Sequence, residues 1–339
     1  MSIDDVSSCA GTPRSPRSSR GFTFIEMIVV VAVVGLMALV VQSTVSGLTA
    51  TERSLRAMRN TVERGQRGLS AVRDSVSTSR KLFQKDTVGN GYLNKLALGS
   101  LPLLAGSRLP VFDESNPLGP DVAGTPMTGN VLLFVREADP LPCIADPTTK
   151  LVRLIDAYRL VCIYTTQTTR RVVAGGPLSL DLVEWRSVVF PSYSQVTSIS
   201  DSTQRTRVVK DLFSRFGRDY LWDPTGSVTT SFYGIDGLGT VAASPTAVTT
   251  IAQDRNVSNA GRFVYANMDV ARTDATSKPR TPLFTADDPA VWTPNGFEVK
   301  VVGPSGSRKV WLRLTIEQQA SKDCVPAQET TAVVSTRDL

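Results

Sequence analysis

The sequence has no histidine among its 339 residues. Histidine is the commonest metal ligand and the commonest general base in proteins, so its absence removes the usual basis of metal centres and of hydrolytic triads. The serine-rich stretch 192–202 therefore has no imidazole to activate a hydroxyl group. No glycine-rich phosphate loop follows a predicted strand either. We therefore predict that the protein is not an enzyme and needs no cofactor.

The sequence also lacks a calcium loop of the usual pattern. Asp236-Gly237 and Asp287-Asp288 come nearest, but neither shows the alternating acidic positions that such a loop uses. We interpret both as turns and predict no metal site.

Proline is absent between Pro16 and Pro102. A proline inside a helix removes a hydrogen bond and clashes with the preceding turn, so this gap permits one uninterrupted helix. Within it, residues 22–41 carry a single charge, Glu26, and are otherwise almost entirely apolar. At about 1.5 Å per residue they cover about 30 Å, the thickness of the hydrocarbon core of a bilayer. We predict a membrane-spanning segment over 22–41.

The residues around the start of this segment have a distinctive order. A leader rich in Ser, Pro and Arg ends in Arg20-Gly21 and runs directly into Phe22-Thr23-Phe24-Ile25-Glu26. No A-x-A-like signal-peptidase site closes the apolar run. The stretch resembles the N-terminus of the type IV pilin and type II secretion pseudopilin family, with Phe24 where leucine is more usual. The resemblance implies cleavage after Gly21 by a prepilin peptidase and methylation of the new amine, giving N-methylphenylalanine at Phe22.

The same resemblance implies a location and partners. The leader, 1–21, is expected to be cytoplasmic, and the protein is expected to cross the inner membrane once with its head in the periplasm. It is then expected in a cell-surface pilus or a periplasmic pseudopilus. The implied partners are the prepilin peptidase, other pilin or pseudopilin subunits, an inner-membrane assembly platform and membrane lipid.

Glu26 is the predicted assembly residue. Cleavage creates an ammonium group at Phe22, at the start of a helix in an apolar medium, and a carboxylate can pair with that charge in its own chain or in a neighbour. The positive end of the helix dipole also favours a carboxylate there. The alternative is that Glu26 only extends toward the polar interface of the membrane.

Beyond the apolar run, the helix pattern continues to about Leu82, within a segment that we place at 22–85. Residues 52–85 contain nine Lys or Arg and three Asp or Glu, a net charge of +6. A stripe recurs at alternating spacings of three and four residues: Leu55, Met58, Val62, Gly65, Leu69, Val72, Val76, Ser79 and Phe83. We predict that this stripe packs on the protein's own sheet, with a coiled-coil seam as the alternative. We do not expect nucleic acid to bind this basic helix, because it has no aromatic side chain between Phe24 and Phe83 for base stacking.

The remainder, 86–339, is predicted to be a sheet-rich head. Its first part, 86–130, is a Gly- and Pro-rich connection with a short element around 92–98. Strand signals follow at 131–136, 151–167, 180–190, 228–233 and 262–270, and a short amphipathic helix is predicted at 208–216. The clearest hairpin pairs 297–301 with 310–316 across Gly303-Pro304-Ser305-Gly306. We predict an α+β fold, a long N-terminal helix packed on an antiparallel sheet, with a loose polar tail at 322–339.

Three of the four cysteines lie in the head. Outside the cytoplasm, three thiols predict one disulfide and one odd cysteine. We favour a bridge between Cys143 and Cys162, with Cys324 as an alternative partner for either, because C-terminal loops are stapled in some pilins. The remaining alternative is that all three are reduced.

The function predicted from these features is structural. The resemblance implies a subunit of a type IV pilus or a type II secretion pseudopilus, and the large head favours a minor subunit. The alternative is a tip adhesin or receptor, whose head binds a surface, a phage, secreted cargo or DNA.

Overall fold

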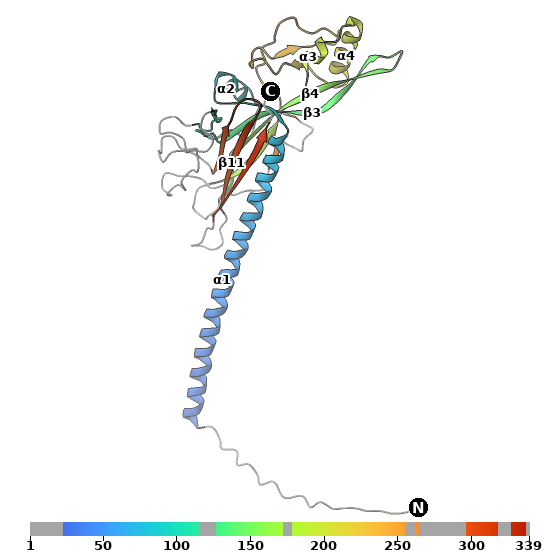
Figure 1. Ribbon diagram of the computed structural model, residues 1–339. Coiled ribbons are helices and arrows are strands. Elements are labelled where there is room, and N and C mark those ends of the chain that lie inside the picture. The colour runs from blue at the N-terminus through green and yellow to red at the C-terminus, as the bar shows by residue number, and fades with distance from the viewer. Residues whose placement is uncertain are drawn as a thin grey trace, which may run out of the picture. The chain divides into compact units, whose positions relative to one another are not determined.

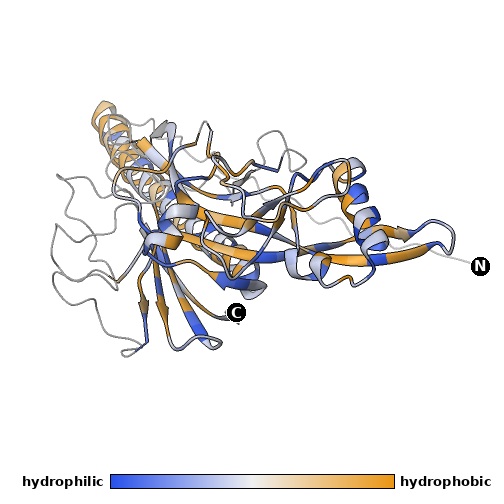
Figure 2. Ribbon diagram, turned by 90° about the horizontal axis from the view of Figure 1, so that it is seen from above, coloured by the Kyte–Doolittle hydropathy of each residue, from blue (hydrophilic) through white to orange (hydrophobic). Residues whose placement is uncertain are grey.

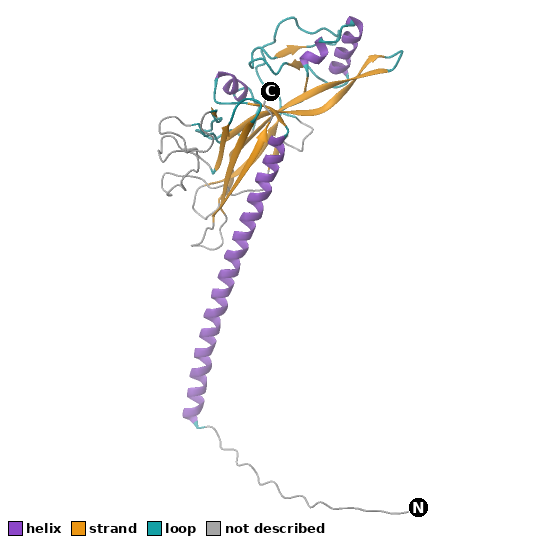
Figure 3. Ribbon diagram, in the orientation of Figure 1, coloured by secondary structure: helices purple, strands orange, loops and turns teal. Residues whose placement is uncertain are grey.

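The computed structural model describes residues 23–99, 101–114, 127–171, 178–254, 262–264, 296–317 and 327–336 (Figure 1). The chain divides into two compact units, Met1–Glu52 and Arg53–Leu339. The helices of the described part are α1 (Phe24–Ser77), α2 (Thr87–Leu93), α3 (Tyr193–Thr197) and α4 (Ser202–Ser214). Its strands are β1 (Ser79–Leu82), β2 (Phe112–Asp113), β3 (Val131–Asp146), β4 (Leu151–Arg171), β5 (Leu178–Arg186), β6 (Phe190–Pro191), β7 (Tyr220–Trp222), β8 (Phe232–Gly234), β9 (Arg262–Val264), β10 (Phe297–Val302), β11 (Arg308–Glu317) and β12 (Ala327–Thr336). A long helix followed by antiparallel sheets confirms the predicted α+β fold (Figure 3).

Helix α1 ends at Ser77, earlier than the predicted Leu82, and the chain continues as strand β1. The neighbours Leu82 and Phe83 enter two different hydrophobic cores. Successive side chains of an extended chain point to opposite faces, whereas neighbours on a helix lie only about 100° apart. The apolar pair Leu82-Phe83 therefore suits an extended chain between two cores, and the predicted helical boundary was wrong.

The larger sheet has the order β1-β3-β4-β5-β9, with β6 paired to β4, and all its ladders are antiparallel. Both faces of its central strands are buried, so these strands are apolar at nearly every position rather than at alternate ones. On β4, for example, Val161 and Ile163 face one core while Leu160 and Cys162 face the other.

A smaller sheet has the order β12-β11-β10-β2. Its β10–β11 hairpin is the predicted one, and the turn uses Gly303 and Gly306 at φ of 96° and 83°, a region open mainly to glycine. Two hydrogen bonds between Gly129 and Val299, each 2.8 Å long, join this sheet to the chain just before β3. The two sheets are thereby connected through their backbones.

The C-terminal strand β12 corrects the predicted loose tail. It pairs with β11 from Arg308↔Thr336 to Glu317↔Ala327. Arg313 on β11 donates to Glu298 on β10 (2.7 Å) and forms an ion pair with Glu329 on β12 (2.8 Å). Burial acts to lower the pKa of Arg313, but the hydrogen bonds to Glu329 and Glu298 outweigh it and raise that pKa. The three charged groups therefore hold three strands together from one face.

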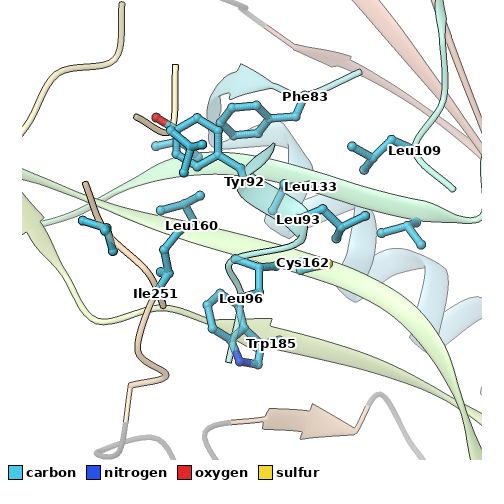
Figure 4. Close-up of a cluster of buried hydrophobic side chains, with 14 of the residues drawn as sticks. Phe83, Tyr92, Leu93, Leu96, Leu109, Leu133, Leu160, Cys162, Trp185 and Ile251 are labelled. Atoms are coloured by element: carbon cyan, nitrogen blue, oxygen red, sulfur yellow. The ribbon is translucent and has the colours of Figure 1, made fainter. Parts of the chain in front are cut away.

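The first core lies between the second half of α1 and the two sheets. It contains side chains of α1, of the larger sheet and of the smaller sheet: Leu69, Val72, Val76, Leu82, Leu132, Phe134, Val161, Ile163, Leu180, Leu182, Phe297, Val299, Val301, Val310, Leu312, Leu314, Ile316 and Val334. The prediction that the helix packs on the protein's own sheet is confirmed for this half of the helix. The opposite face of the larger sheet is covered by α2 and neighbouring loops, which form a second core around Tyr92 and Trp185 (Figure 4).

Strands β3 and β4 continue beyond the rest of the larger sheet as a two-stranded hairpin (Figure 1). Helices α3 and α4 lie against one of its faces and form a third core with it, which includes Cys143, Ile155 and Leu212. Helix α4 begins at Ser202, before the predicted start at 208, because the Asp201 side chain caps it by accepting from the N–H groups of Thr203 and Gln204.

The predicted stripe on α1 is correct only in its second half. Leu55 and Met58 are exposed, and the buried residues that precede Leu69 are small: Ala57, Thr61, Gly65 and Gly68. A Cβ atom at Gly65 would lie 2.8 Å from Thr330 Oγ1 and 3.4 Å from Ile316 Cδ1. The helix therefore approaches β11 and β12 through small residues, of which the predicted stripe included only Gly65.

We predict that Gly65→Val destabilises the head by about 1–3 kcal/mol, because the branched side chain overpacks the contact between α1 and β12. Thermal or urea unfolding of the full-length chain in detergent checks this. Gly47→Ala is the matched control, since nothing lies within 4 Å of a Cβ at Gly47. Equal stability of the Gly65→Val variant and the wild type would contradict the packing.

Candidate functional site at the start of the first helix

Thr23 and Glu26 form a closed arrangement at the start of α1. The N–H and the hydroxyl group of Thr23 both donate to Glu26 Oε2, at 2.8 and 2.9 Å. The N–H of Glu26 in turn lies 3.3 Å from Thr23 Oγ1, which accepts it. This is a capping box, in which a Thr before the helix and a Glu three residues later satisfy N–H groups that the helix itself leaves unpaired.

The capping box gives Glu26 an orientation that the sequence analysis did not predict. Both bonds end on Oε2, and among the described residues no hydrogen bond ends on Oε1. The carboxylate is thus turned back toward the residue that precedes the helix, with one oxygen available. Thr23 is the capping residue that was missed, and the signal was present as a Thr-x-x-Glu spacing before an apolar run.

The processing residues predicted from the sequence precede the described part of the chain. Arg20, Gly21 and Phe22 fall outside the described residues, so the proposed pairing of Glu26 with the Phe22 amine stays a prediction.

The helix that follows the capping box is apolar and exposed. Its large side chains from Phe24 to Leu48 are exposed throughout the first compact unit, for example 78% at Phe24 and 65% at Leu39. Helix α1 contains a stretch long and apolar enough to cross a membrane, with no residue of that stretch buried inside the protein. An apolar surface of this extent calls for lipid or other helices around it.

Hydroxyl groups at the end of the apolar stretch are satisfied within the helix. Thr44, Thr49 and Thr51 each donate to the carbonyl oxygen four residues earlier, at 2.7–2.9 Å. Such bonds let polar residues sit in an apolar environment without an unpaired donor. The helix surface therefore remains suited to an apolar environment beyond Val41, because these hydroxyl groups need no hydrogen-bond partner outside the helix.

These features define a class, namely a protein with one N-terminal apolar helix, compatible with a single pass through a membrane, followed by a sheet-rich unit. The comparison with known families is more specific. Residues 16–41 match the family described as the prokaryotic N-terminal methylation motif. The chain therefore carries a type IV pilin- or pseudopilin-like prepilin segment, which implies processing by a prepilin peptidase and assembly with other pilin subunits. No curated protein and no solved structure matches the chain significantly.

Among the residues that the structure describes, no group of three or more Cys, Asp or Glu side chains is arranged to hold a metal ion. Asp236 is a turn residue, as predicted, because its Oδ1 accepts the N–H groups of Thr240 (2.8 Å) and Leu238 (3.0 Å). These backbone bonds, that of Thr240 most, lower the pKa of Asp236. Asp287 and Asp288 lie outside the described residues.

The predicted bridge between Cys143 and Cys162 is contradicted, because both cysteines are free and buried. Cys143 pairs with Arg153 in the β3–β4 ladder, whereas Cys162 pairs with Leu133. At about 3.3 Å per residue, the two thiols are separated by about 30 Å of strand, far beyond the reach of a disulfide. They lie in different cores, and Figure 4 shows Cys162 beside Leu160 and Trp185. Cys324, the alternative partner, lies outside the described residues.

Both thiols are predicted to be unreactive in the folded protein. Burial, with a smaller contribution from Asp211, raises the pKa of Cys143 to about 12, and burial also raises that of Cys162. Because the thiolate is the reactive form, alkylation by iodoacetamide at pH 8 should be at least about hundredfold slower than in urea, and should accelerate as pH rises. Peptide mass mapping measures each rate. A non-reduced peptide pair linking Cys143 to Cys162 would overturn the assignment.

Proposed function

We propose that the protein is a minor structural subunit of a type IV pilus or a type II secretion pseudopilus. The prepilin segment supports the filament class, and the large sheet-rich head supports a minor position rather than that of the bulk subunit. In this proposal a prepilin peptidase cuts after Gly21, following Arg20, and Phe22 becomes N-methylphenylalanine. An inner-membrane assembly platform then moves the subunit from the lipid bilayer into the filament, with its head in the periplasm or at the cell surface.

The observation that carries this proposal is the orientation of Glu26. The capping box turns its carboxylate toward the start of the helix, where cleavage would create the amine of Phe22. In an apolar environment an ammonium and a carboxylate attract strongly, since little water screens them. The amine of the same chain or of a neighbouring subunit is the partner of Glu26, and pairing between neighbours sets the register of the helices in the filament.

The head supports a second candidate function. The β3–β4 hairpin extends past the other strands and has a core of its own with α3 and α4. Such an extension is not required for packing α1. A tip adhesin or receptor that uses this head to bind a surface, a phage, secreted cargo or DNA is therefore the alternative.

Two substitutions separate the charge of Glu26 from its capping role. Glu26→Gln keeps an acceptor for the Thr23 N–H but removes the charge, and Thr23→Ala removes the hydroxyl but keeps the charge. We predict that Glu26→Gln is processed normally yet enters filaments at least about tenfold less often. Thr23→Ala should assemble more nearly as the wild type. The measurement is the amount of each variant in sheared filaments, with the mass of the N-terminal peptide as the control for processing.

Equal incorporation of Glu26→Gln and wild type would remove the charge-pairing mechanism. Filament counts after deletion of the gene distinguish the two candidate functions. A minor subunit needed for assembly predicts fewer filaments, whereas a tip adhesin predicts normal numbers of filaments that fail to bind their target.

A further inference from the structure

Strand β4 has an outer edge that is covered in one part and open in another. β6 covers the edge at Ala157 and Tyr158. At Asp156, the main-chain carbonyl oxygen accepts the N–H of Ser192, and the main-chain N–H donates to the side chain of Gln195 at 2.7 Å. Over Leu151–Ile155, strand β4 pairs with β3 on its other side only, within the described part of the chain. Within the described part of the chain, the outer edge of β4 therefore has no strand partner over these five residues.

The open edge presents main-chain hydrogen-bonding groups. The carbonyl groups of Leu160 and Asp156 point to this side, because they accept the N–H groups of Ser187 and Ser192. The hydrogen-bonding direction of a strand repeats every two residues, and β4 has no extra residue between Asp156 and Leu151. The N–H and C=O groups of Leu154 and Val152 therefore point outward as well, in the arrangement that an added strand requires.

Apolar side chains lie beside this edge on the face of the hairpin away from α4. Leu154 is 66% exposed, Val152 50% and Ile144, which pairs with Val152, 42%. On the opposite face, Ile155 and Cys143 are buried against α3 and α4. Figure 2 shows hydrophobic residues along the hairpin. Native proteins usually protect a strand edge with charges, proline or a covering segment, so an exposed apolar edge indicates a contact with another polypeptide.

The edge also forms one wall of a groove of about 700 Å³. The other wall is the end of α3 and the residues after it, with Gln195, Ser198 and Ser200 among the lining residues. Such a groove has room for a single extended chain beside β4, and the hydroxyl groups opposite offer polar contacts to its outer edge.

We propose that the open edge of β4 binds an extended segment of another polypeptide as an added antiparallel or parallel strand, with apolar and acidic side chains in alternation. The apolar side chains would cover Val152, Leu154 and Ile144. The acidic ones would face the side of Arg153, which is exposed and donates to Gln204 (3.1 Å). Main-chain bonds supply affinity in this mode of recognition, and alternate side chains supply specificity.

A second copy of the chain fits this edge less well. A twofold axis centred on the open segment would place Arg153 directly opposite Arg153, and like charges in that position destabilise a sheet. Charge complementarity therefore favours an acidic partner. The open edge of β4 belongs to the head, and binding there does not depend on assembly into a filament.

The test uses the full-length chain in detergent micelles and a synthetic probe, fluorescein-labelled Thr-Glu-Val-Glu-Val-Thr with blocked ends. We expect saturable binding by fluorescence anisotropy. The same peptide with the main-chain nitrogens of its four central residues methylated has no central N–H group to donate to β4 in either strand direction, and should bind at least about tenfold more weakly. A peptide with lysine in place of glutamate should also bind more weakly, because it meets Arg153.

Leu154→Pro tests the edge itself. The Leu154 N–H points away from β3, and proline is tolerated on an edge strand at such a position. The variant should unfold at nearly the wild-type temperature yet lose probe binding at least about tenfold. Leu154→Thr, which keeps the N–H, is the matched control and should bind within about threefold of wild type.

Equal binding of the methylated and unmethylated peptides would overturn the proposal without relying on any variant. Probe binding by Leu154→Pro at wild-type strength would also overturn it. A third contrary outcome is that the probe does not bind while the chain self-associates through an edge that Leu154→Pro blocks, which would assign the surface to a second copy.

Discussion

The shared core of α1 and the two sheets is the constraint on which the rest of the head depends. One stretch of helix, from Ala57 to Val76, has to fill a space bounded by β-strands from distant parts of the sequence. Small residues at its beginning permit a close approach to β12, and larger ones further along fill the core. The helix closes, from a third side, the core that lies between the larger and the smaller sheet.

The two parts of helix α1 differ in the surfaces that they expose. Its first part exposes large apolar side chains and satisfies its hydroxyl groups internally, while its second part is exposed only on the side away from the sheets and is rich in arginine there. Ion pairs such as Arg59–Glu63 on that exposed side contribute little to stability, because both groups are largely solvated. Change in composition along a single helix, rather than a break in it, therefore separates the apolar segment from the head.

Much of this arrangement could be predicted from the sequence, where the signal was local. The apolar run, the Gly303–Gly306 hairpin and the α+β class follow from residue patterns within short windows. The errors concern contacts between distant residues. Strand β12 is polar at most positions, and its pairing with β11, the Arg313–Glu329 ion pair and the burial of Val334 hold it as a strand. The separation of Cys143 from Cys162 depends on the β3–β4 register, which spacing along the chain does not reveal. At the candidate site, Glu26 was identified by its charge within an apolar run, whereas Thr23 was overlooked although its spacing from Glu26 is that of a capping box.

Strand β4 takes part in all three cores. Val161 and Ile163 belong to the first, Leu160 and Cys162 to the second, and Ile155 to the third. Because one continuous strand is common to all of them, loosening any core removes support from the other two. The projecting hairpin is therefore not a separately folding module attached to the head. We expect it to unfold together with the sheet, and a protease cut in the exposed turn at 147–150 to leave its two strands held in place by the body of the protein.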